Sequence, residues 1–152
     1  MKCVILYNLR SAHNVGSIFR TADGAGVSKI YLIDTTPAPI DRFGRKRKDI
    51  AKVALGAEES VEWEYAKDIF SILENLREED SKIVAVEQDE QSTTLSDFSP
   101  QEKTAYIFGS ETKGLPEEVL NEADTILEIP MKGKKESLNV SVAAGIILFS
   151  NL

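Results

Sequence analysis

The chain has 152 residues, of which 42% are hydrophobic and 28% charged, and its formal net charge is −7. One cysteine, Cys3, and one histidine exclude a disulfide framework and a cysteine-rich zinc site, and they argue against any metal held by protein side chains. No apolar stretch has the length of a membrane span or the features of a secretory signal, so we expect a single cytoplasmic domain over residues 1–152.

Strands and amphipathic helices alternate along the first half of the chain. Residues 2–7 form an apolar strand, and a helix follows from about Asn14, with apolar side chains at helical spacing, and ends near Gly24. A second strand covers residues 29–33. Residues 34–52 are predicted to form a long basic loop that leads into a short helix, and loops of that length tend to be functional or mobile.

The second half repeats the alternation. Strands are predicted at 60–65, 82–87, 104–109 and 125–130, helices at 66–79 and from 115–118 onward, and a polar loop at 88–103. The final segment, from Asn139, is apolar nearly all round, which predicts a helix buried either in the core or against a partner chain. The alternation predicts an α/β fold with a mostly parallel sheet flanked by helices.

Positive charge is concentrated in two short segments of this acidic chain. Residues 42–52 hold six cations against one acid, and residues 131–136 hold three cations against one acid. A run of charge is usually a solvated surface, and the negative total argues against nucleic-acid binding over the whole protein. Two interpretations therefore stay open: ordinary solvated surface, or one shared basic patch.

A first polar segment, residues 10–22, interrupts an otherwise apolar helix. Asn14 is placed to cap the helix, while Gly16, Ser17 and Arg20 share the face that the apolar side chains leave open. A glycine inside a helix costs about 1 kcal/mol relative to alanine, which suggests that something approaches the backbone at Gly16. The alternative is an ordinary cap and a solvated arginine.

A second segment, residues 107–116, is a glycine-bounded turn between a strand and a helix, the place where open α/β sheets bind ligands. It is not a P-loop, because Lys113 precedes Gly114, and it lacks the third glycine of a dinucleotide fingerprint. A plain tight turn is the alternative.

A third segment, residues 129–145, opens the last helix. Ser137, Asn139 and Ser141 precede or begin an otherwise apolar run, so hydroxyls and amides are expected at the positive end of that helix, where they can bind an anion or a polar ligand. Capping alone is the alternative.

Together the three segments resemble the SpoU/TrmH-type RNA ribose 2′-O-methyltransferases of the SPOUT superfamily over nearly the whole chain. The resemblance is carried by R-S-x-x-N-V-G-x-x-x-R-T-A at 10–22, by F-G-x-E-x-x-G-L at 108–115, and by I-P-M followed by S-L-N-V-S-V-A-A at 129–144. The segment ALGAEESVEW at 54–63 resembles the family's intermediate region. Three motifs in the right order and separation are far more specific than one.

The resemblance implies a catalytic domain with a C-terminal deep trefoil knot that works as a homodimer on RNA, with S-adenosylmethionine bound in the knotted loops. It assigns active-site positions to Asn14, Arg20, Glu111, Ser137 and Asn139. It places the methyl donor against Gly109, Ile129, Met131, Ser137 and Leu138.

The residue types suit this chemistry. A ribose hydroxyl is a very weak acid, so its methylation requires a positioned oxygen, help with the proton and an aligned electrophilic methyl group. A guanidinium, with a pKa above ~12, keeps its proton, so we expect Arg20 to contact a phosphate or the hydroxyl and to stabilise the developing alkoxide, with base catalysis left open. Asn14 and Glu111 are expected to orient Arg20 and the neighbouring loops, while Ser137 and Asn139 position the ribose and close the site.

With this resemblance, the two basic segments are expected to form one positively charged surface around the site (the predicted single mouth) that binds RNA phosphates. The residues assigned to it are Arg42, Arg45, Lys46, Arg47, Lys48 and Lys132. We expect no additional N-terminal RNA-binding domain, so recognition is assigned to the catalytic domain, its dimer partner or another protein, with tRNA favoured over rRNA. The alternatives are a non-catalytic RNA-binding or cofactor-sensing protein on the same fold, and an unrelated nucleotide-binding α/β domain.

Overall fold

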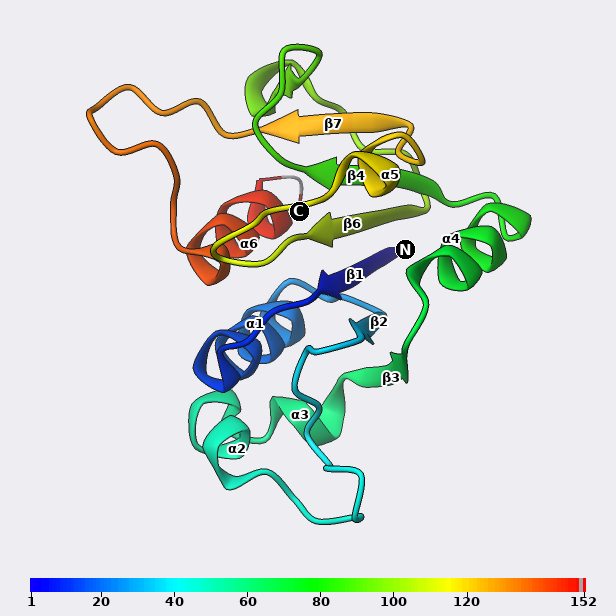
Figure 1. The fold of residues 1–152 in the computed structure, drawn as a ribbon, viewed down its shortest axis with the longest axis vertical. Coiled ribbons are helices and arrows are strands. Elements are labelled where there is room, and N and C mark those ends of the chain that lie inside the picture. Colours follow the sequence, from blue (N-terminus) through cyan, green and yellow to red (C-terminus); the bar gives the residue numbers. More distant parts are fainter. Residues whose placement is uncertain (151) are drawn as a thin grey trace.

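A parallel sheet of seven strands runs through the middle of the protein (Figure 1). The computed structural model describes residues 1–150 and 152. The sheet order is β3-β2-β1-β6-β4-β7-β5, and every neighbouring pair is parallel. The strands are β1 (Lys2–Tyr7), β2 (Lys29–Ile33), β3 (Glu62–Ala66), β4 (Lys82–Val86), β5 (Thr93–Thr94), β6 (Thr104–Phe108) and β7 (Thr125–Glu128).

Helices cover both faces of this sheet. They are α1 (Ala12–Gly24), α2 (Lys48–Ala54), α3 (Ala57–Ser60), α4 (Ile69–Glu78), α5 (Glu117–Leu120) and α6 (Val140–Phe149). Apolar residues of α1, α2, α3 and α6 pack on one face, whereas those of α4 and the residue Val119 of α5 pack on the other. The predicted α/β class, with a mostly parallel sheet and flanking helices, is confirmed.

The strands in the middle of the sheet, β1, β2, β4 and β6, are buried on both faces, which explains their continuous apolar sequences. In β1, Val4 and Leu6 belong to the core on the α1 side, while Cys3 and Ile5 belong to the core on the α4 side, because successive side chains of a strand point to opposite faces. Burial raises the pKa of the Cys3 thiol. This thiol is therefore a core group, not a reactive one.

The start of α1 differs from the sequence prediction. Ser11, not Asn14, is the N-cap, and its hydroxyl accepts a hydrogen bond from the backbone nitrogen of Asn14 at 3.1 Å. A serine in extended conformation reaches the third helical residue as well as an asparagine does, so the helix begins earlier than expected. The Asn14 side chain is consequently free for another contact.

The surroundings of Gly16 also differ from the prediction. It is buried, and a Cβ at this position would lie 2.7 Å from the carbonyl oxygen of Ile50 and 3.0 Å from the Cβ of Val53. The group that approaches the Gly16 backbone is therefore helix α2, and the expectation that Gly16 shares an open face with Arg20 is wrong. The polar loop predicted at 88–103 contains the short strand β5 and a 3₁₀ turn at Leu95–Asp97.

Helix α6 is covered on one side only. Ala144, Ile147 and Leu148 are buried, whereas Val142, Ile146 and Phe149 are 50%, 39% and 47% exposed. The chain's own core thus covers one side of α6 and leaves an apolar face exposed. None of the helices in the described residues, α6 included, combines the length and the apolar composition that crossing a bilayer requires.

Candidate active site

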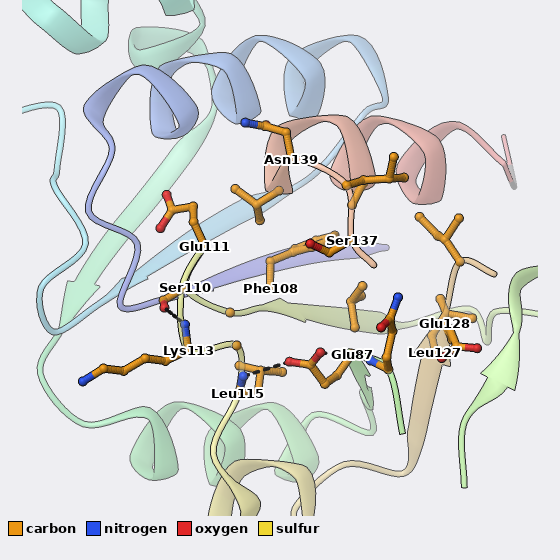
Figure 2. A pocket seen from close by; sticks show the side chains of 18 of the residues that line it. Glu87, Phe108, Ser110, Glu111, Lys113, Leu115, Leu127, Glu128, Ser137 and Asn139 are labelled. Carbon is orange, nitrogen blue, oxygen red and sulfur yellow. Dashed lines mark hydrogen bonds between the residues drawn. The ribbon is translucent and has the colours of Figure 1, made fainter. Parts of the chain in front are cut away.

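A cavity of about 680 Å³ opens at the carboxyl ends of β4, β6 and β7, beside the start of α6 (Figure 2). This edge is where open α/β sheets bind their ligands, and the volume is within the range of small-molecule pockets. Its walls come from the ends of these strands, the loop 109–115, the loop after β7 and the first turn of α6.

The cavity gathers predicted site residues that are far apart in the sequence. The predicted donor-binding residues and two further predicted active-site residues line it: Gly109, Glu111, Ile129, Met131, Ser137, Leu138 and Asn139. Figure 2 shows Glu111, Ser137 and Asn139 around the same hollow, although Glu111 follows β6 and the other two lie at the start of α6. The second and third sequence motifs therefore form one site.

Asn14 reaches this site through Glu111. The Asn14 Nδ2 donates a hydrogen bond to Glu111 Oε1 at 3.1 Å. Asn14 is buried and Glu111 is exposed, so a fixed amide holds a carboxylate at the cavity wall. This bond joins the first sequence motif to the second, across 97 residues of chain.

Asn139 caps helix α6. Its Oδ1 accepts hydrogen bonds from the backbone nitrogen of Ser141 at 2.9 Å and from the Ser141 hydroxyl at 2.6 Å. The side-chain oxygen of Asn139 is therefore used for helix capping, which was the alternative to ligand binding. The Asn139 Nδ2 makes no hydrogen bond within the described residues, so this donor is available to a ligand in the cavity.

The loop after β6 is packed so closely that it requires two glycines. A Cβ on Gly109 would lie 2.6 Å from the carbonyl carbon of Gly114. A Cβ on Gly114, whose φ is +62°, would overlap Glu87 Oε2, the atom that accepts a hydrogen bond from the backbone nitrogen of Leu115 at 3.0 Å. Glu87 therefore holds the end of this loop against β4.

Glu87 is a site residue that the sequence reasoning missed. The available signal was an acid directly after a buried strand, at the edge where the other motifs meet. Glu111 and Glu128 also line the cavity, against a single cation, Lys113. The negative balance of these side chains favours a ligand that carries positive charge. Within residues 1–150, no group of three or more metal-binding side chains forms.

Arg20 lies outside the cavity. It is exposed on α1, six residues after Asn14, which corresponds to about 9 Å along the helix axis. In the described residues it makes no hydrogen bond and no ion pair, and it does not line the cavity. Contrary to expectation, neither Asn14 nor Glu111 orients Arg20 within one chain.

The two basic segments are far apart within one chain. Figure 1 places the loop before α2, which holds residues 42–47, at the bottom of the view and the loop between β7 and α6 at the upper left. The first loop follows β2, near one edge of the sheet, whereas the second follows β7, near the opposite edge. The predicted single mouth is therefore wrong for a single chain.

Several of the predicted RNA-binding cations are paired with acids. The pairs are Arg45 with Asp41, Lys46 with Glu59 and Arg47 with Asp49, with N···O distances of 3.1, 3.0 and 2.7 Å. The hydrogen-bonded guanidinium of Arg47 lowers the pKa of Asp49. Among the described residues, Arg42, Lys48 and Lys132 pair with no carboxylate. The free positive charge at residues 42–48 is thus smaller than the sequence suggests.

Comparisons with known proteins cover almost the whole chain. Residues 1–149 match the model of the SpoU rRNA Methylase family. The chain is 34% identical over 146 residues to the 23S rRNA (guanosine-2'-O-)-methyltransferase RlmB of Escherichia coli (strain K12), which covers 96% of this chain and 57% of that protein. The chain thus spans a little over half the length of the curated relatives it matches.

Solved structures share the fold. An AdoMet-bound rRNA methyltransferase from Sinorhizobium meliloti superposes with a TM-score of 0.83 at 27% identity, covering 97% of this chain and 54% of that one. A structure that gives insights into the 2-OH methylation of C/U34 on tRNA superposes with a TM-score of 0.83 at 28% identity, covering 98% of this chain and 92% of that one.

Proposed function

Because the chain belongs to the SpoU rRNA Methylase family, we propose that it transfers a methyl group from S-adenosylmethionine to a ribose 2′-hydroxyl of RNA. The observation that carries the proposal is the cavity at the ends of β4, β6 and β7, where two of the sequence motifs meet and the third is attached through the Asn14–Glu111 hydrogen bond. The relatives named above act on the RNAs in their names, and one of them was solved with AdoMet bound.

The cavity fits this methyl donor. Close packing between Gly109 and Gly114 leaves backbone groups at one wall, and Ile129, Met131 and Leu138 supply apolar surface for a flat ring. Glu87, Glu111 and Glu128 balance a sulfonium charge better than an apolar lining would. When bound, the donor supplies an electrophilic methyl group. The residues that would hold it are those predicted: Gly109, Ile129, Met131, Ser137 and Leu138.

The remaining residues act on the ribose. Ser137 and the free Nδ2 of Asn139 position the sugar, since both can donate hydrogen bonds into the cavity. Loss of the 2′-hydroxyl proton to solvent would leave negative charge on the ribose oxygen. That charge would be consumed as the oxygen bonds the methyl carbon, while the carbon–sulfur bond of the donor breaks and a neutral thioether leaves. Arg20 contacts a phosphate or this oxygen and stabilises the charge, because a charge-assisted hydrogen bond is stronger than a neutral one.

The proposal includes a homodimer. Val142, Ile146 and Phe149 form an exposed apolar face on α6, of the kind that a second copy covers. Arg20 is exposed and lies outside the cavity of its own chain. In a dimer it can therefore complete the cavity of the other copy, which a monomer cannot do.

We also propose a knotted C-terminal region, a cytoplasmic location and a preferred class of RNA. The loops 109–115 and 129–139 line one cavity, and α6 then packs on α1, an arrangement consistent with a C-terminal deep trefoil knot. We place the protein in the cytoplasm. We favour tRNA over rRNA, and the neighbour whose structure gives insights into the 2-OH methylation of C/U34 on tRNA supports this choice at 28% identity.

Replacing Arg20 tests the proposed role directly. Arg20→Ala should abolish methyl transfer to RNA while S-adenosylmethionine affinity, measured by calorimetry, stays unchanged, because Arg20 does not line the cavity. Arg20→Lys, which keeps the charge but not the planar fork, should retain a small part of the activity. Loss of cofactor affinity together with transfer would show that Arg20 belongs to the donor site. Full activity of Arg20→Ala would contradict its assignment altogether.

A further inference from the structure

Phe43 stands at the tip of a short surface hairpin and adds nothing to the core. The residue is 67% exposed. We call residues 39–47 the tip hairpin: Ile40 and Lys46 form an antiparallel bridge, and the backbone nitrogen of Arg47 donates to the Pro39 oxygen at 2.8 Å. A single exposed apolar residue is ordinary on a protein surface, so the meaning of Phe43 depends on how the hairpin presents it.

Asp41 holds the tip hairpin in shape. Its Oδ1 accepts hydrogen bonds from the backbone nitrogens of Phe43 at 2.9 Å and Arg45 at 3.0 Å, and its Oδ2 accepts one from Arg45 Nε at 3.1 Å. Gly44 supplies the left-handed turn, with φ of +77°. The aromatic ring is therefore carried on an ordered turn, which reduces the entropy lost when a ligand binds there.

Two guanidinium groups flank this ring. The Cζ of Arg42 lies 4.9 Å from the ring centroid of Phe43, and the Cζ of Arg45 lies 5.1 Å from it. Aromatic rings and guanidinium planes are the groups on which proteins stack unpaired RNA bases, and the same cations attract the neighbouring phosphates. A paired base is already stacked inside its helix and offers no free face.

We propose that the tip hairpin binds an unpaired base of the RNA substrate by stacking it on Phe43, with Arg42, which pairs with no carboxylate in the described residues, against the adjoining phosphate. This inference rests on the proposed function, which makes RNA the partner. The hairpin lies at the bottom of the view in Figure 1, whereas the 129–139 loop of the cavity lies at the upper left. It is thus a recognition site separate from the cavity of its own chain, and it selects RNA with a loop or single-stranded segment.

The test measures binding of the full chain to an unstructured single-stranded RNA that carries a fluorescent adenine analogue. Phe43→Ala should weaken binding by about 5- to 150-fold, the range measured for loss of one base–aromatic stack, and should remove the stacking-induced quenching of the analogue. Phe43→Tyr should keep both properties, whereas Phe43→Leu should lose both. Phe70→Ala is the matched control, since Phe70 is 41% exposed but lies on α4.

A blunt RNA duplex of the same composition should bind wild type and Phe43→Ala equally. The inference is overturned if Phe43→Ala or Phe43→Leu binds the single strand like wild type, or if the duplex loses as much affinity. It is also overturned if wild type binds phosphatidylserine vesicles through Phe43 but not the RNA. The proposed function fails separately, if wild type binds the single strand with Phe43-dependent quenching yet transfers no methyl group to any RNA.

Discussion

At the scale of single residues, the site depends on glycines whose missing side chains let two loops touch. Gly109 faces the backbone of Gly114, and Gly114 faces the carboxylate of Glu87. Both glycines appear in the motif at 108–115, so their presence could be read from the sequence, and Gly109 meets Gly114 within that motif, but the partner of Gly114, Glu87, follows another strand. Glu87 in particular stands in no motif and is recognised only once β4 and β6 are paired.

Gly109→Ala should therefore damage the cavity. The added methyl group would lie 2.6 Å from the Gly114 carbon, and such overpacking costs about 1–3 kcal/mol, which lowers the Tm by about 2–4 °C per kcal/mol in a protein of this size. Cofactor affinity, measured by calorimetry, should fall as the loop moves. Gly133→Ala is the control, because a Cβ there meets nothing within 4 Å. Equal Tm and affinity in the two variants would contradict the close packing described here.

At the scale of elements, four strands were predictable because each is a short apolar run buried on both faces. The sequences of β1, β2, β4 and β6 predict buried strands, since their residues contribute to the cores on both faces of the sheet. Strand β5 escaped prediction because two threonines carry no periodicity. The burial of Gly16 was not predicted for a different reason. Its neighbour, helix α2, follows a long loop, and no local sequence pattern determines where such a loop places the next helix.

Helix α6 was ambiguous from the sequence, since an apolar helix can face a core or a partner. Its exposed side predicts that Ile146→Glu produces a monomer, because a buried, unpaired carboxylate at the interface is costly. Sedimentation should show wild type as a dimer and this variant at half the mass, with cofactor binding kept and transfer lost, as Arg20 lies outside its own cavity. Phe70→Glu, an exposed position on α4, should remain dimeric. A monomeric wild type with full activity would contradict both the dimer and the role given to Arg20.

At the scale of the whole molecule, the sequence motifs predicted most of the residues that line the cavity but not the positions of the remaining predicted site residues. Ser137 and Asn139 flank the same cavity as Gly109 and Glu111, as the motif order implied. A spacing of six residues places Asn14 and Arg20 on different sides of α1, so the helical spacing itself indicates that Asn14 does not orient Arg20 within one chain. The two basic segments look alike in sequence, and only the sheet order reveals that they lie near opposite edges of the sheet.

The proposed chemistry is tested most directly by locating the methyl group that the protein transfers. The protein is incubated with isotopically labelled S-adenosylmethionine and separate tRNA and rRNA fractions, and the digested nucleosides are analysed by mass spectrometry. We expect label on ribose 2′-oxygens of RNA, more in the tRNA fraction, and none with Asn139→Ala, which removes a donor from the cavity. Label on bases, or unlabelled RNA in every fraction despite bound cofactor, would contradict the proposed reaction.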